Sequence, residues 1–374
     1  MAAAYYQVNA PIFGLVHVLR PDGRCVVAYI GGGGSSKTGV GNRVEIAETG
    51  TEGLKALATY DTGQELGASL AVSRDGKLLV ACFGPKLRAF STDCLRGEPP
   101  TLSVRGSDVA ADFHPKEPSL NCCRVAPGDA LVATGGDDGK LRLWNAATLT
   151  KAQECEAHGG PITDVDFASS GVLACSASKD GTCCVWSVAT GAKVACLDAA
   201  KANPRVVVPT ARLMCRGCKF DGDAKLYSVC SSTRGPAYLS TWTLAPPAKG
   251  VALLEATNDF AHKVSKYPVS SMTAARGVIA LGDVDGTVSL VSAKSGGRKL
   301  VAKKHHDLPV TALAWREGGQ DDPRFAILSA SADYKIAALA VPTTEGSGGL
   351  FFTVLVPILM TLLAVLLAFL FKEE

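Results

Sequence analysis

A glycine-rich segment near the amino terminus is the first place where residue types and spacing could support chemistry. Residues 30–42 read IGGGGSSKTGVGN. Gly31, four intervening residues and the Ser-Lys-Thr of positions 36–38 match the phosphate-binding pattern GxxxxGK[ST] except for its second glycine. A P-loop opens a helix whose first amides bind phosphate, whereas Asn42 leads directly into the strand-like RVEIAE. The sequence therefore argues against a directly bound nucleotide and against nucleotide hydrolysis.

Four aspartates are the next candidates for chemistry, and their spacing gives them a structural role. Each precedes an apolar strand residue by six positions, in the pairs Asp138/Trp144, Asp180/Trp186, Asp285/Val291 and Asp333/Leu339. Such regular repetition favours carboxylates that accept turn amides over catalytic carboxylates. We therefore predict no catalytic residue and no covalent catalysis.

Histidines and cysteines give no stronger signal for a catalytic or metal site. His158 and His306 each precede a strand in the repeat, and we expect each to bond within its own blade. Cys215 and Cys218 form a single CxxC without a second such pair or a suitable pair of histidines, which disfavours zinc.

Internal repeats indicate the elements that carry these residues. The phrases GGDDGKLRLW, SASKDGTCCVW, GDVDGTVSLV and SADYKIAAL each read as a strand, a tight turn and a second strand. With the upstream His they resemble the WD repeat, whose period of about 40–50 residues matches a four-stranded propeller blade. We therefore predict an all-β, seven-bladed WD-repeat propeller, with six or eight blades as the alternatives because the first, second and fifth units are the least similar to the repeat. Its units are expected near residues 11–50, 54–95, 108–149, 156–196, 212–246, 267–297 and 305–341.

The carboxyl-terminal segment predicts a membrane anchor. Residues 350–371 contain no charge, and as a helix these 22 residues would span about 33 Å, enough for a bilayer core. The expected organisation is a propeller over 1–341, a flexible linker over 342–349, a transmembrane helix over 350–371 and a short lumenal tail over 372–374. The amino terminus has no basic region followed by an apolar run, so we expect no signal peptide and a cytosolic propeller.

Charge and cysteine content narrow the partners and the compartment. The formal net charge is +3, and the basic residues are scattered, so nucleic-acid binding is not expected. Many of the thirteen cysteines sit inside predicted strands, which agrees with a reducing compartment.

The glycine-rich segment, the propeller and the carboxyl-terminal helix together resemble the Sec-twelve family. This family comprises endoplasmic-reticulum exchange factors for the Sar small GTPase, including prolactin regulatory element-binding proteins. The resemblance implies a guanine-nucleotide exchange factor in the endoplasmic-reticulum membrane, with the carboxyl terminus in the lumen. Its GTPase, once loaded, would start coat protein complex II vesicle formation, so that the coat is an indirect partner.

The resemblance also implies roles for residues of the glycine-rich segment. Lys37, Thr38, Gly39, Val40 and Asn42 would contact the GTPase, and the four glycines from Gly31 to Gly34 would shape the base of the loop. The loop would be organised around a potassium ion, and its ligands would come from Gly31, Ser35, Ser36, Thr38 and Asn42. Backbone carbonyls and hydroxyls are the oxygen donors that a hard cation prefers.

A rival interpretation keeps the same architecture and changes the function. The chain would be a membrane-tethered propeller scaffold that helps specific cargo leave the endoplasmic reticulum without exchange activity. Plant relatives of that kind have a degraded glycine loop, and the intact GGGGSSKTGVGN favours the exchange factor.

Overall fold

The structure is a computed structural model in which every described element is a β-strand. It describes residues 3–20, 24–35, 39–50, 53–93, 100–156, 158–198, 213–245, 254–293, 298–315 and 327–341. Residues 1–340 form one compact unit. The predicted linker, transmembrane helix and tail lie outside the described residues, and within the described part no helix is long and apolar enough to cross a membrane.

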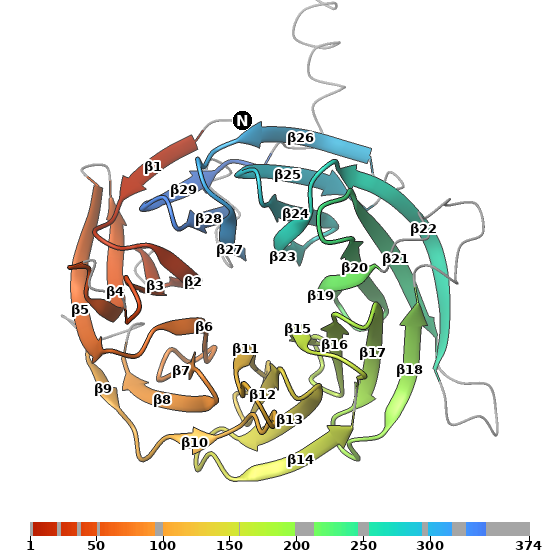
Figure 1. The fold of residues 1–374 in the computed structure, drawn as a ribbon, viewed down its shortest axis with the longest axis horizontal. Helices are drawn as coiled ribbons and strands as arrows, with labels where there is room; N and C mark the ends of the chain where they lie inside the picture. The colour runs from red at the N-terminus through yellow and green to blue at the C-terminus, as the bar shows by residue number, and fades with distance from the viewer. Residues whose placement is uncertain are drawn as a thin grey trace, which may run out of the picture. The chain divides into compact units, whose positions relative to one another are not determined.

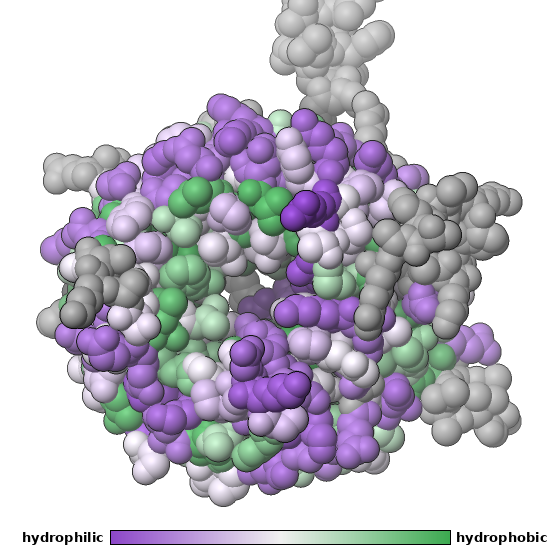
Figure 2. Space-filling view, viewed as in Figure 1, coloured by the Kyte–Doolittle hydropathy of each residue, from purple (hydrophilic) through white to green (hydrophobic). Residues whose placement is uncertain are grey.

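Seven antiparallel sheets surround a central opening, which confirms the predicted propeller and its seven blades (Figures 1 and 2). The strands of each blade are given from the innermost outward. Blade 1 contains β2 (Ile12–Leu19), β3 (Cys25–Gly31), β4 (Asn42–Gly50) and β5 (Gly53–Gly63), and blade 2 contains β6 (Gly67–Val72), β7 (Leu78–Phe83) and β8 (Lys86–Thr92), which is edged by β9 (Leu102–Val104) and β10 (Val109–Ala110). Blade 3 contains β11 (Leu120–Val125), β12 (Leu131–Gly136), β13 (Lys140–Asn145) and β14 (Lys151–Glu156), and blade 4 contains β15 (Ile162–Phe167), β16 (Leu173–Ser178), β17 (Thr182–Ser187) and β18 (Lys193–Asp198).

Blades 5 to 7 follow the same order. They are β19 (Met214–Asp221), β20 (Lys225–Ser231), β21 (Ala237–Ala245) and β22 (Glu255–Ser265); β23 (Val269–Ala275), β24 (Val278–Asp283), β25 (Thr287–Ser292) and β26 (Arg298–Lys304); and β27 (Val310–Trp315), β28 (Ile327–Ser331), β29 (Lys335–Leu339) and β1 (Ala3–Gln7).

The ring is closed by the amino-terminal strand. β1 pairs antiparallel with β29, from Ala3 opposite Leu339 to Gln7 opposite Lys335. The predicted units placed β1 in no blade, and they assigned β5 to the second unit although it is the outer strand of blade 1. The predicted units therefore misplace these outer strands, because outer strands lack the Asp-turn signature that marks the inner hairpins.

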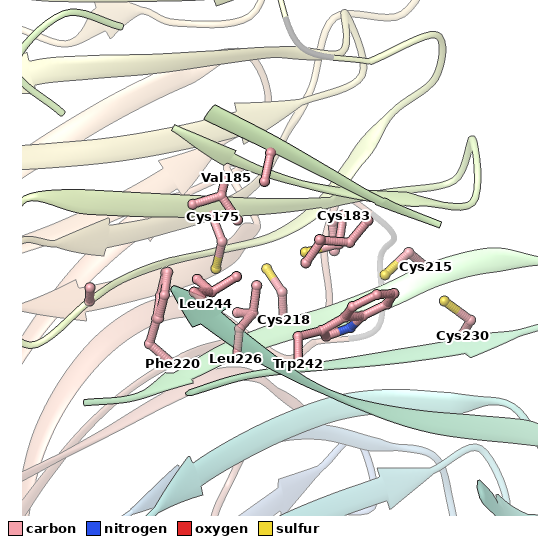
Figure 3. Packing of buried hydrophobic residues seen from close by; sticks show 14 residues of the cluster. Cys175, Cys183, Val185, Cys215, Cys218, Phe220, Leu226, Cys230, Trp242 and Leu244 are labelled. Carbon is pink, nitrogen blue, oxygen red and sulfur yellow. The ribbon is translucent and has the colours of Figure 1, made fainter. Parts of the chain in front are cut away.

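Buried clusters lie between blades rather than inside them. β7 reads LLVACF and is buried at all six positions, because a second strand has a neighbouring blade on each face and needs no alternation. Figure 3 shows the seam between blades 4 and 5, where Cys175 and Cys183 meet Phe220 and Trp242. Since neighbouring blades share their cores, each blade depends on the next for burial.

The repeat residues hold the turns, as their spacing predicted. Asp180 accepts hydrogen bonds from the amides of Gly159 and Thr182, each at 2.9 Å. Its carboxylate also lies 3.2 Å from Nδ1 of His158, and Nε2 of the same ring lies 2.8 Å from the Ser176 hydroxyl. Trp186 Nε1 donates to the same hydroxyl at 2.9 Å. This chain of hydrogen bonds ties β16 and β17 to the segment that leads into β15.

Blade 7 keeps the aspartate and the histidine, blade 3 keeps the aspartate and the tryptophan, and blade 6 modifies the turn. His306 joins Asp333 at 3.1 Å in blade 7, and Asp138 accepts the amide of Lys140 at 2.9 Å in blade 3. In blade 6 the turn amides of Asp285 and Thr287 go to the buried carboxylate of Asp283, at 3.0 and 3.1 Å. The predicted role of Asp285 therefore belongs to the residue two positions earlier.

Candidate functional site

The glycine-rich segment is the connection between β3 and β4, the second and third strands of blade 1. Because all blades share one strand order, these connections emerge on one face of the ring, together with the connections that lead from each blade to the next. We call this the loop face. The segment replaces the short Asp-containing turns that occupy the equivalent place in blades 3, 4 and 7. The structure describes its residues 31–35 and 39–42, whereas 36–38 lie outside the described part.

Two of the glycines permit close backbone contacts at the base of the loop. A Cβ on Gly31 would lie 2.0 Å from the carbonyl oxygen of Pro11, and one on Gly32 would lie 2.2 Å from Asn42 Oδ1. Gly32 donates its amide to that Pro11 carbonyl at 3.0 Å. Gly32 also has a φ of +151°, which side-chain-bearing residues rarely adopt. Only glycine fits at these two positions without a shift of the backbone.

Asn42 ties the loop base to the rest of blade 1. Its Oδ1 accepts the amide of Gly34 at 2.8 Å, and its Nδ2 donates to the carbonyls of Gly34 at 3.1 Å and Gly63 at 2.9 Å. The side chain is 2% exposed. We call these three hydrogen bonds the Asn42 clamp. The clamp joins both ends of the loop to the end of β5, so hydrogen bonds within blade 1 fix the base of the loop.

Two ion pairs of Arg88 hold the connection between blades 1 and 2 and the edge of blade 2. Arg88 lies between Glu65 and Asp108, with one nitrogen 2.6 Å from a carboxylate oxygen of each. The hydrogen bond to Asp108, with smaller help from Glu65, raises the pKa of Arg88, and the pKa of Asp108 is lowered in turn. Glu65 lies in the connection that follows Gly63, whose carbonyl accepts a hydrogen bond from Asn42. The ion pair between Arg88 and Glu65 therefore holds the chain next to the Asn42 clamp.

A buried acid lies on the strand pair from which the loop projects. Glu45 on β4 accepts a short hydrogen bond from the hydroxyl of Tyr29, its cross-strand partner on β3. Burial, followed by this hydrogen bond, raises the pKa of Tyr29. Arg43 approaches Glu45 at 3.8 Å and balances its charge. Sequence reasoning missed this pair, because its only signal is the register that places Tyr29 opposite Glu45.

The predicted site residues divide between base and tip. The structure brings Gly31 to Gly34 together with Asn42 at the base, and Gly33 donates its amide to the carbonyl of Val40 at 3.3 Å. Gly39 is exposed, has a φ of +77° and would have no atom within 4 Å of an added Cβ. Ser35 is also exposed. Ser36, Lys37 and Thr38 are outside the described residues, so their predicted contacts remain predictions.

Among the described residues, no group of three or more His, Cys, Asp or Glu side chains is arranged to hold a metal ion. Cys215 and Cys218 instead point into the apolar seam of blades 4 and 5 (Figure 3). The arrangement can present a short exposed segment on a rigid base.

Comparison with known proteins gives two kinds of match. The model of the WD domain, G-beta repeat, matches residues 110–145 and 149–187. Guanine nucleotide-exchange factor SEC12 of Rattus norvegicus is 23% identical over 359 residues, which cover 83% of this chain and 82% of the relative. The Mus musculus protein of the same name is 24% identical, with the same coverage.

Other matches cover a smaller part of the chain. The guanine nucleotide-binding protein subunit beta of Arabidopsis thaliana is 32% identical over 123 residues, or 32% of this chain. That match spans 31% of the relative. Protein Atg16l2 of Homo sapiens is 38% identical over 89 residues, which cover 23% of this chain and 14% of the relative. Among these relatives, the SEC12 proteins match over most of the chain, whereas the other two match over a third of it or less.

Proposed function

We propose, from its membership of the SEC12 family of WD-repeat proteins, that the chain is a guanine nucleotide-exchange factor for a small GTPase. The observation that carries this proposal is the loop of blade 1, whose exposed segment stands on a base fixed by the Asn42 clamp. A propeller used only as a docking surface has no need for a lengthened turn with glycine at two crowded positions.

Exchange requires binding and no covalent step. A protein that binds the nucleotide-free GTPase more tightly than the loaded one weakens nucleotide affinity by the same factor, because the two binding equilibria are linked. The propeller supplies a rigid surface, and the segment between Gly34 and Asn42 is the part that would enter the GTPase. Holding its base in one conformation lowers the entropy lost on binding.

The partner and the location form the finer part of the proposal. The GTPase would be of the Sar type, and the product of exchange would recruit coat protein complex II. Residues 350–371 would anchor the propeller in the endoplasmic-reticulum membrane. Restricting exchange to one membrane would decide where the GTPase is loaded.

Potassium is a further part of the proposal. The described loop supplies backbone carbonyls and the exposed hydroxyl of Ser35, which are oxygen donors suited to a hard cation. Asn42 Oδ1 already accepts the amide of Gly34, so it would add a ligand bond to an existing hydrogen bond. Replacing potassium chloride by lithium chloride should lower both the exchange rate and the melting temperature; unchanged values of both would remove the ion from the proposal.

The decisive experiment measures release of a fluorescent guanine nucleotide from a Sar GTPase. The full chain in lipid vesicles and a fragment of residues 1–341, which keeps all seven blades, should both accelerate release. A variant with Lys37 to Val40 replaced by a Gly/Ser segment of equal length should lose this activity. If the unaltered protein leaves the release rate at its intrinsic value, the exchange proposal is wrong, and the cargo-export scaffold becomes the better interpretation.

A further inference from the structure

Two cysteine side chains of blade 4 face each other across neighbouring strands. Cys184 on β17 and Cys196 on β18 are direct cross-strand partners, and their sulfur atoms lie 3.6 Å apart. Directly opposed strand residues have Cα separations of about 4.5–5.5 Å, within the range that a disulfide spans. Closing the sulfurs to the length of an S–S bond, about 2.05 Å, therefore requires side-chain rotation and no rearrangement of the strands.

The two thiols differ in exposure. Cys196 is the one exposed thiol among the cysteines whose surroundings the structure describes, whereas Cys184 is 1% exposed. Cys184 belongs to the apolar cluster between blades 3 and 4, which also contains Cys155 and Trp186. A small oxidant in solvent can therefore reach Cys196 directly, whereas burial shields Cys184.

The charges around the pair favour a thiolate on Cys196. The S–H of Cys184 donates toward Cys196, and this contact lowers the pKa of Cys196 to about 6, with further help from Lys193 and against the opposing charge of Asp180. The same contact, together with burial, raises the pKa of Cys184. Lys193 is held on this side of β18 by the ring of Trp186, 5.6 Å from its ammonium nitrogen.

We propose that Cys196 and Cys184 form a peroxide-reactive thiol pair that closes to a disulfide. The Cys196 thiolate attacks one oxygen of a hydroperoxide, the O–O bond breaks, and the leaving hydroxide or alkoxide takes up a proton. The product is a sulfenic acid on Cys196. The sulfur of Cys184 then attacks the Cys196 sulfur, loses its proton and expels water. The peroxide is reduced by two electrons, and the two thiols are oxidised to one disulfide.

The disulfide would have a defined structural effect. It would tie β18, the outer strand of blade 4, covalently to β17, closing a short loop within one hairpin. In a reducing compartment such a bond is transient, which suits a response to oxidant better than a permanent staple. The pair lies in blade 4, whereas the exchange loop lies in blade 1, so this inference does not depend on the proposed function.

The first test follows the thiols of the full chain by peptide mass spectrometry. Hydrogen peroxide at pH 7 should produce a peptide that links Cys184 to Cys196, and dithiothreitol should remove it. Cys184→Ser should instead accumulate a dimedone-reactive sulfenic acid at Cys196, and Cys196→Ser should leave Cys184 reduced. Cys155→Ser is the matched control, because Cys155 lies in the same cluster and burial raises its pKa to about 11. This variant should form the linkage like the unaltered chain.

A second test needs no substitution. Between pH 7.5 and 6, alkylation of Cys196 by iodoacetamide should slow by about twofold, whereas an ordinary thiol with a pKa of about 8.5 slows by about 30-fold. Two results would overturn the inference: a 30-fold slowing at Cys196, or peroxide treatment that yields no Cys184–Cys196 peptide while other thiols are oxidised.

Discussion

Replacing Asn42 with alanine should separate the support of the loop from its chemistry. The change removes the three hydrogen bonds of the Asn42 clamp and leaves the amide of Gly34 and the carbonyls of Gly34 and Gly63 without this partner. A hydrogen bond contributes about 0.5–1.5 kcal/mol to stability, and more when a buried partner remains unsatisfied. We expect the free energy of unfolding to fall by about 2–4 kcal/mol.

The size of the propeller converts this loss into a small change of melting temperature. The entropy of unfolding is about 2.1 cal/mol/K per residue, or about 0.7 kcal/mol/K for residues 1–340. The melting temperature of Asn42→Ala should therefore fall by only about 3–6 °C, measured by differential scanning calorimetry. Nucleotide release should fall at least tenfold, because a loop without a fixed base must be ordered on binding.

Asn121→Ala is the matched control for this variant. Asn121 Nδ2 donates to Asp137 and to the carbonyl of Ile162, both at 2.9 Å, and so links blades 3 and 4 far from the loop. It should lower the melting temperature by a similar amount and leave the release rate unchanged. If the GTPase releases its nucleotide as fast with Asn42→Ala as with the unaltered chain, the clamp does not position the loop and the account of the site given above is wrong.

Three further predictions concern the loop and the closure of the ring. Gly32→Ala should reduce the release rate and the melting temperature, because its Cβ would lie 2.2 Å from Asn42 Oδ1, whereas Gly41→Ala meets no atom within 4 Å and should change neither; equal behaviour of the two would contradict the crowded base. The Gly/Ser replacement of Lys37 to Val40 should change the melting temperature by less than about 1 °C, since a surface loop is expected to contribute little packing, and a larger loss would give the replaced segment a structural role. His305, whose Nδ1 lies 2.9 Å from the hydroxyl of Tyr5 on the closing strand, has its pKa lowered to about 4 by burial and by Lys303. Because the fold favours the neutral ring, its contribution is present above about pH 6.5 and is lost as the pH falls toward 4. Between pH 6.5 and 4, the free energy of unfolding, measured by urea titration, should therefore fall by about 1–3 kcal/mol less in His305→Gln than in the unaltered chain. An identical pH profile in the two proteins would refute this assignment.

The inner hairpins of the blades could be predicted because their determinants are local. An Asp-containing turn followed by an alternating strand lies within about ten residues, and Trp144 and Trp186 fall on the third strands as that spacing requires. The same locality marked the glycine-rich segment as an interruption, since its composition differs from every other turn between second and third strands. The resemblance of that segment to the loop of exchange factors stays a prediction, and its tip lies outside the described residues.

The tertiary structure decided every feature that depends on strands brought together from distant parts of the chain. Ala3–Gln7 carries no repeat signature, and only its pairing with Lys335–Leu339 shows that it completes blade 7. The contact of Asn42 with a GTPase stays a prediction, but only the structure shows that Asn42 also holds the base of the loop, through its hydrogen bonds with Gly34 and Gly63. Cys184 and Cys196 became a pair only through the register of β17 and β18. A sequence pattern records which face a residue prefers, but the residue that lies opposite it is set by the packing of the whole ring.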